Sequence, residues 1–209
     1  MTILALEFSS PRRSVALARD EMVLAEAVEH GGGRGTNAFG LIEKVLADAR
    51  AKREEIEVIA IGLGPGSYTG IRAAIAVAQG WQLARDVRLL GVSSVASLAL
   101  EAQMQRIFGT VNLVVDAQRG EFYLSRWNIS EEQRMETAPL KIVTAAEVQA
   151  RLASGEVCAG PEMTHALFPS AATVAQLAAS RTDFMSGEKL EPIYLRETTF
   201  VKAPVSRTV

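Results

Sequence analysis

The chain has 209 residues, of which 48% are hydrophobic and 22% are charged. A chain of this size and composition buries a core as one domain or as two small lobes, which excludes a disordered tail. Its formal net charge of -2 and its isoelectric point of about 5.8 give no overall attraction to phosphate backbones, so strong direct RNA binding is disfavoured.

Cysteine content and the first residues indicate the compartment. Cys158 is the single cysteine, which excludes an internal disulfide and a thiolate metal cluster and is typical of a reducing environment. The opening residues, MTILALE, carry no basic flank and no apolar run of signal-peptide length. No later stretch is long and apolar enough to span a bilayer. We therefore expect a cytoplasmic protein that does not contact membranes.

Strand and helix patterns alternate through the first half of the chain. Apolar runs bounded by turn residues predict strands, and apolar residues at three- and four-residue spacing predict helices. The predicted strands cover 2–8, 14–18, 22–29, 58–61 and 88–92. The predicted helices cover 37–50, 67–85 and 93–106, and Thr36 or Asn37 caps the first of them.

A second series of elements begins with two strands in a hairpin. The predicted strands cover 111–116, 120–127 and 140–143, the helices cover 145–152 and 171–181, and 192–196 is extended. Two blocks that each begin with hairpin-linked strands predict a duplicated α/β architecture, with mixed sheets, helices packed on them and a cleft between two lobes. We place the lobes at residues 1–106, which carry the partner interface, and 107–209, which are abbreviated.

The stretch GLGPGSYTGIR at 62–72 joins a predicted strand to a predicted helix. Closely spaced glycines before a helix can present several backbone N–H groups to an anion. A Walker-type phosphate loop requires a lysine that this stretch lacks, and the dinucleotide fingerprint requires a glycine or alanine where Ser67 stands. Two interpretations fit: a sharp turn that lets the helix pack tightly on the sheet, or a weak, vestigial phosphate site.

The helix after this stretch carries no charged residue between Arg72 and Arg85, and its apolar side chains surround most of its circumference. Either the rest of the chain covers it, the predicted helix 37–50 above all, or a second protein does. Small residues along it would let another helix approach closely. On the second interpretation, the partner interface consists of Leu41, Val45, Gly70, Ala73, Ala74, Val77, Ala78 and Trp81. Asp in place of Ala74 or Val77 is then expected to abolish pairing and leave the isolated chain folded.

Four segments resemble the TsaB (YeaZ) family, in the family's order. They are LALEFSS at 4–10, GLGPGSYTGIRAAIAVAQG at 62–80, VVDAQRGEFY at 114–123 and PIYLRE at 192–197. The resemblance implies an actin-like ATPase fold of the ribonuclease H-like class with two lobes. It also implies a non-catalytic subunit that pairs with TsaD, which transfers threonylcarbamoyl to the tRNA adenosine next to the anticodon. TsaE, an ATPase, joins that pair, and TsaC makes the threonylcarbamoyl-adenylate donor.

The resemblance also bears on the contacts of the chain. A subunit of this family would reach tRNA only through the complex. Without its partner, the apolar helix face would tend to self-associate, so we expect a homodimer when the chain is alone.

An actin-like cleft would bring together Glu7 and Asp116, which end the leading strand of each half. Relatives with a working site usually carry an aspartate where Glu7 stands. The vestigial phosphate site would consist of Glu7, Gly64, Gly66, Ser67, Thr69, Gly70 and Asp116. His30 and His165 form no metal-binding pair in the sequence, and no nucleophile with an adjacent base stands out. We therefore expect no catalytic residue, no metal site and no resident cofactor, with at most weak binding of ATP, ADP or Mg²⁺.

Two other functions fit the same fold. A free-standing ATP-dependent phosphotransferase or ATPase would use Glu7, Asp116 and the 64–70 turn. A peptidase is the third interpretation, and the lack of a metal or nucleophile constellation in the sequence counts against it.

Overall fold

The structure is a computed structural model that describes residues 1–30 and 37–196. One sheet contains β1 (Thr2–Glu7), β2 (Arg12–Arg19), β3 (Met22–His30), β4 (Val58–Gly62) and β5 (Arg88–Val92). The other contains β6 (Gly109–Asp116), β7 (Glu121–Ile129), β8 (Arg134–Thr144), β9 (Val157–Gly160) and β10 (His165–Ala166). The helices are α1 (Ala38–Asp48), α2 (Tyr68–Ala84), α3 (Ser94–Met104), α4 (Ala145–Ala153) and α5 (Ala171–Ala178), with short 3-10 turns η1 (Arg53–Glu55) and η2 (Gly187–Lys189).

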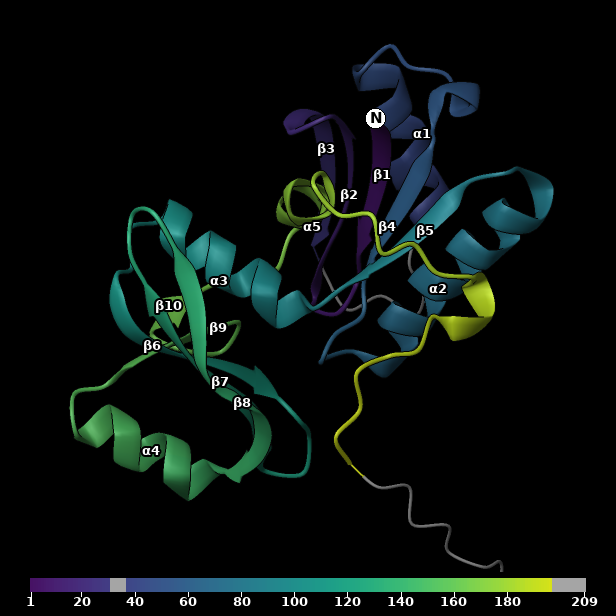
Figure 1. The fold of residues 1–209 in the computed structure, drawn as a ribbon. Coiled ribbons are helices and arrows are strands. Elements are labelled where there is room, and N and C mark those ends of the chain that lie inside the picture. The colour runs from purple at the N-terminus through teal and green to yellow at the C-terminus, as the bar shows by residue number, and fades with distance from the viewer. Residues whose placement is uncertain (31–36, 197–209) are drawn as a thin grey trace, which may run out of the picture.

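The two sheets repeat one topology. The first has the order β3-β2-β1-β4-β5, and the second has the corresponding order β8-β7-β6-β9-β10. In each sheet the first three strands pair antiparallel and the last two run parallel to the leading strand. The predicted duplicated α/β fold with two mixed sheets is therefore confirmed, and Figure 1 shows the two sheets as separate lobes.

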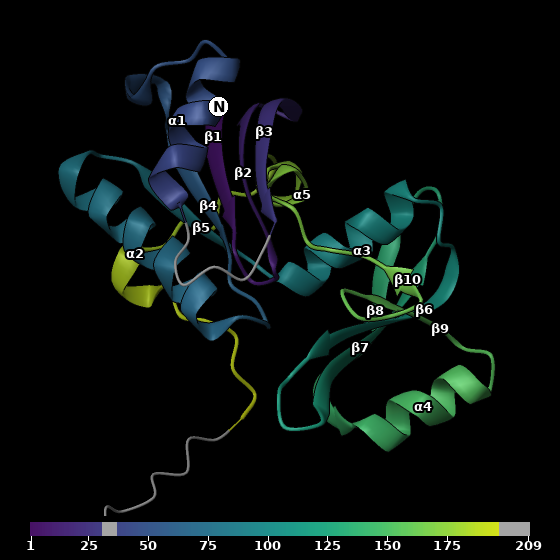
Figure 2. The same ribbon diagram turned by 180° about the vertical axis from the view of Figure 1, so that it is seen from behind.

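One helix from each half of the sequence packs on the sheet formed by the other half. Helices α1 and α2 cover one face of the first sheet, and α5 packs on its opposite face through Val174, Ala175 and Ala178 (Figure 2). In the second lobe, α4 covers one face and α3 covers the other. The predicted boundary at residue 107 thus misplaces α3 and α5, because the apolar faces of these helices pack on the sheet across the boundary. The last thirteen positions of the predicted second lobe, 197–209, lie outside the described residues.

The second lobe is abbreviated, as predicted. The first lobe has the 17-residue helix α2 between its two parallel strands, whereas residues 161–164, all of them described, form a short turn between β9 and β10. Strands β9 and β10 are not among the predicted elements, because at four and two residues they are too short for a recognisable periodicity. Asn37 caps α1 by accepting from the Gly40 amide, and Thr36 lies outside the described residues. No helix in the described part of the chain is long and apolar enough to cross a membrane.

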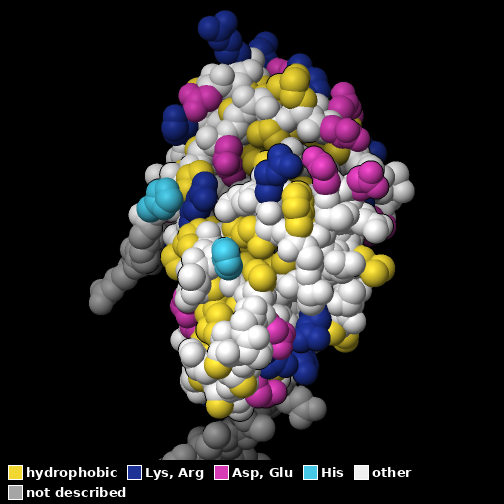
Figure 3. All heavy atoms as spheres, turned by 90° about the vertical axis from the view of Figure 1, so that its left-hand side faces the viewer, with side chains coloured by type: hydrophobic (Ala, Val, Ile, Leu, Met, Phe, Trp, Pro, Cys, Tyr) yellow, Lys and Arg dark blue, Asp and Glu magenta, His cyan; other side chains and the backbone are white. Residues whose placement is uncertain are grey.

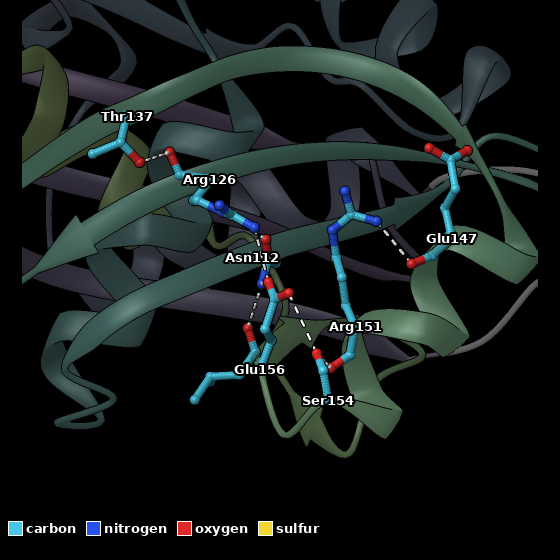
Figure 4. Close-up of polar contacts among 8 residues, drawn as sticks. Asn112, Arg126, Thr137, Glu147, Arg151, Ser154 and Glu156 are labelled. Atoms are coloured by element: carbon cyan, nitrogen blue, oxygen red, sulfur yellow. Dashed lines mark hydrogen bonds and ion pairs between the residues drawn. The ribbon is translucent and has the colours of Figure 1, made fainter.

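A network of polar side chains lies on the face of the second sheet that α4 covers (Figure 4). Asn112 is fully buried, and its amide donates to the Glu156 carboxylate at 3.0 Å and to the Val157 carbonyl at 3.2 Å. Arg126 donates to the Asn112 side-chain oxygen at 3.2 Å and to Glu156 at 2.8 Å. The hydrogen bond from Asn112 lowers the pKa of Glu156. These residues satisfy one another, so the network joins β6, β7 and the start of β9.

Candidate functional site

The glycines of the 62–72 stretch seat α2 against the turn between β1 and β2. A Cβ at Gly66 would lie 2.1 Å from the Ser9 carbonyl oxygen, and a Cβ at Gly70 would lie 2.0 Å from the Phe8 carbonyl oxygen. The Ser67 amide donates to the Ser9 carbonyl at 2.6 Å. Only glycine permits this approach of two backbones, so the tight-packing interpretation of the glycines accounts for Gly66 and Gly70.

Glu7 is fully buried beneath this turn, where its carboxylate links two segments by hydrogen bonds. Its carboxylate accepts from the Ser9 amide at 2.7 Å and from the Ser94 hydroxyl at 2.7 Å. The Ser94 oxygen in turn accepts from the Gly64 amide at 3.0 Å. Burial raises the pKa of Glu7, and the hydrogen bonds from Ser9 and Ser94 oppose that rise. The carboxylate therefore joins β1, the glycine stretch and the start of α3.

A cleft of about 470 Å³ lies between the lobes. Its lining residues are Ser9, Ser10, Pro11, Arg13, Pro65, Gly66, Ser67, Tyr68, Thr69, Ser94, Leu98, Val115, Asp116, Gln118, Pro161, Glu162 and Pro169. Asp116 faces this space but is already engaged, because it accepts from the Gln118 amide at 2.8 Å and from the Gln118 side chain at 2.5 Å.

The structure brings together only part of the predicted phosphate site. Gly66, Ser67, Thr69 and Asp116 line the cleft, whereas Gly64, Gly70 and Glu7 do not. The predicted pairing of Glu7 with Asp116 needs correction. Glu7 lies on the same face of β1 as Ile3 and Ala5, which pack on α5, and it has no exposed surface. Its carboxylate is bonded to Ser9 and Ser94 and not to Asp116.

Helices α1 and α2 leave an apolar groove of about 420 Å³ on the outside of the first lobe. Its lining residues are Phe39, Ile42, Arg53, Ala76, Val77, Gly80, Trp81, Ala84 and Arg85. Phe39 is 69% exposed and Leu83, near the end of α2, is 90% exposed. A Cβ at Gly80 would meet no atom within 4 Å, so the middle of this helix face is open.

The predicted partner interface needs correction in detail. The chain's own fold buries five of the eight predicted residues: Leu41, Val45, Gly70, Ala74 and Ala78. Ala73, Val77 and Trp81 are half-buried, and the latter two line the groove. Asp in place of Ala74 would place a charge in the core, so that substitution would unfold the chain and cannot test pairing.

The angular position of each residue around α2 explains which residues of the open face the predicted interface omits. Ile71, Ala74, Ile75 and Ala78 face the sheet, so the opposite face presents Ala76, Gly80 and Ala84 at four-residue spacing. Phe39 and Leu83 belong to the same exposed face. The four-residue spacing of these small residues places them on one face of the helix. Because the helix is apolar almost all round, the sequence does not indicate which face packs on its own sheet.

The histidines do not lie together. His30 ends β3 and His165 begins β10, and Figure 3 shows the histidine side chains apart from each other on one face. Among residues 1–30 and 37–196, no three histidine, cysteine or carboxylate side chains gather closely enough to hold a metal ion.

Glu7→Gln is expected to change how stability depends on pH. The pKa of Glu7 lies above its usual 4.5 when folded, so the folded chain keeps a proton that the unfolded chain releases. Stability of the natural chain therefore falls as pH rises above 4.5 toward the folded pKa, and the glutamine variant lacks this part of the fall. Urea unfolding across that range measures the difference. Glu101, whose pKa burial also raises, contributes to both proteins alike. If stability depended on pH in the same way in both proteins, the raised pKa of Glu7 would be contradicted.

Comparison with known proteins places this geometry in a family. A family model described as TsaD, tRNA N6-adenosine threonylcarbamoyltransferase, matches residues 36–195. The chain is 31% identical to the tRNA threonylcarbamoyladenosine biosynthesis protein TsaB of Bacillus subtilis over 59% of this chain and 53% of the relative. It is 30% identical to the Escherichia coli protein of the same name, over 63% of this chain and 57% of the relative. The chain thus matches little more than half the length of these curated relatives.

A solved structure confirms the fold. YeaZ from Pseudomonas aeruginosa superposes with a TM-score of 0.79 at 23% identity, covering 93% of this chain and 99% of that one. The predicted α/β fold of two duplicated lobes with mixed sheets agrees with this similarity. The chain therefore belongs to the family that the TsaD model describes and, within it, to the TsaB (YeaZ) group.

Proposed function

We propose that this chain is the non-catalytic subunit that binds and supports TsaD while threonylcarbamoyladenosine forms in tRNA, at the adenosine next to the anticodon. The observation that carries the proposal is the open apolar groove between α1 and α2, on a helix without charge between Arg72 and Arg85. The names of the TsaB relatives supply the pathway. The chain would act in the cytoplasm and reach tRNA only through the complex, which TsaE joins.

The choice of TsaD as occupant follows from the family match. The TsaD family model matches a range that includes both α1 and α2, so we expect TsaD to carry an equivalent helix pair. Two like surfaces can meet about an approximate twofold axis, with each helix pair in contact with the other. The same geometry predicts a homodimer when the chain is alone, because a second copy offers the same surface.

Shape and charge at the groove fit a helix pair. Ala76, Gly80 and Ala84 permit close approach of a second helix backbone, and Phe39 and Leu83 provide large apolar contacts beside it. Burial of such surface is favourable by roughly 25 cal/mol per Å². The charged rim is already paired within the chain: Arg53 with Glu43 at 2.7 Å and Arg85 with Glu54 at 2.6 Å. These pairs leave the groove floor free of exposed charge.

The chemistry of the cleft supports a non-catalytic role. The carboxylate of Asp116 accepts hydrogen bonds from Gln118, and Glu7 is buried within the first lobe. The second candidate, a free-standing ATP-dependent phosphotransferase or ATPase, is favoured only by Ser67, Thr69 and Asp116 along the cleft wall.

Calorimetry with Mg-ATP on the isolated chain separates the two candidates. We expect at most weak binding of ATP or ADP and no turnover, because Glu7 is buried away from the cleft and Asp116 is hydrogen-bonded to Gln118. Micromolar affinity together with ATP hydrolysis would favour the phosphotransferase.

Gly80→Glu is expected to abolish pairing with TsaD. The new side chain enters open space in the free chain, and a non-glycine residue favours the helix by up to ~1 kcal/mol, so the fold persists. In the complex, it would place a charge and added bulk at the point of closest helix approach. We expect affinity for purified TsaD to fall at least about a hundredfold, roughly 3 kcal/mol.

Ala150→Glu is the matched control, since Ala150 is exposed on α4 in the other lobe. Reconstitution with TsaD, TsaE, TsaC, tRNA, threonine, bicarbonate and ATP should lose modification with Gly80→Glu and keep it with Ala150→Glu. Full pairing and modification by the Gly80→Glu chain would show that the groove is not the TsaD surface.

A further inference from the structure

The last described segment, residues 185–196, forms a strap over the first lobe. The Met185 amide donates to the Leu89 carbonyl at 3.0 Å, and the Ile193 amide donates to the Leu63 carbonyl at 2.8 Å. Between these points, the Gly187 backbone bonds the side chains of Gln79 and Gln82 on α2, each at 2.8 Å. The strap is therefore fastened to β5, to α2 and to the glycine stretch (Figure 1, yellow).

The same strap then reaches the second lobe. Tyr194 stacks on Tyr68, which lines the cleft, with ring centroids 5.3 Å apart. Two residues later, Arg196 donates to the Ala117 carbonyl at 3.1 Å and forms an ion pair with Glu121. Both figures of the ribbon show the strap descending toward this end of the second sheet (Figures 1 and 2). One short segment thus contacts both walls of the cleft.

Arg196 binds a turn whose backbone is unusual. Gln118, Arg119 and Gly120 all have left-handed φ angles, of 65°, 60° and 75°. Two consecutive residues with side chains in this region cost free energy and persist only when their surroundings hold them. Asp116 and Gln118 at the start of this turn line the cleft, so the conformation of the turn shapes the cleft wall.

We propose that Arg196 is an inter-lobe latch: it holds the left-handed 117–121 turn in place and so fixes the second lobe's wall of the cleft against α2. An exposed ion pair alone would contribute little. Arg196 and Glu121 are only 31% and 41% exposed, and the guanidinium also satisfies a backbone carbonyl of the turn. The latch joins segments that are 75 residues apart in sequence, which local turn contacts cannot do.

Amide hydrogen exchange on the isolated chain tests the latch. In Arg196→Ala we expect about tenfold faster exchange in residues 117–121, the factor that corresponds to ~1.4 kcal/mol, with the core strands unchanged. Arg196→Lys keeps the charge but lacks the planar guanidinium that donates to both the Ala117 carbonyl and the Glu121 carboxylate. Exchange in this variant should therefore be intermediate. The control is Arg19→Ala, which removes the more exposed Arg19–Glu55 pair in the first lobe. It should leave the turn unchanged.

A distance measurement between the lobes is the second readout. Spin labels at exposed Asp86 and Ala150, with the buried Cys158 replaced by alanine, report the separation of the lobes. Arg196→Ala should broaden the distance distribution, and Arg19→Ala should not. Unchanged exchange in the turn, faster exchange spread evenly over the whole chain, or an unchanged distance distribution would each overturn the latch. Because the chain is tested alone, these results do not depend on TsaD.

Discussion

The contact of α2 with the turn between β1 and β2 is the constraint on which the rest of the site depends. Gly66 and Gly70 let the helix approach the carbonyls of Ser9 and Phe8 more closely than any side chain would allow. That contact sets the rotation of α2 about its axis, because Ile71 and Ala74 must then face the sheet. The opposite face, with Ala76 and Gly80, is left without cover in the described chain. A structural requirement inside the lobe thereby determines which face of α2 is left open.

Glu7 has a structural role that the sequence does not predict. It ends the leading strand, where the family resemblance implied a carboxylate that faces the cleft. In the structure it joins β1 to Ser94 and, through that hydroxyl, to Gly64. The cleft retains helix-start residues and Asp116, but its walls are held by contacts within the chain. The strap from Met185 to Arg196 is the clearest of these, since it touches both lobes.

Much of the fold could be predicted from the sequence, because long periodic segments such as 67–85 and the hairpin at 111–127 carry strong local signals. The exchange of α3 and α5 between lobes could not, since periodicity shows that a helix has an apolar face but not which sheet it covers. The predicted interface failed in detail for the same reason. Ala74 and Ala76 are indistinguishable by composition, and only the contact at Gly70 decides that the first is inside and the second outside.

Hydrogen exchange with and without TsaD shows whether the α1–α2 groove receives TsaD, as proposed. With saturating TsaD, we expect slower exchange in residues 38–48 and 76–84 and unchanged exchange in α4. Protection confined to the second lobe, or to the cleft wall alone, would contradict it.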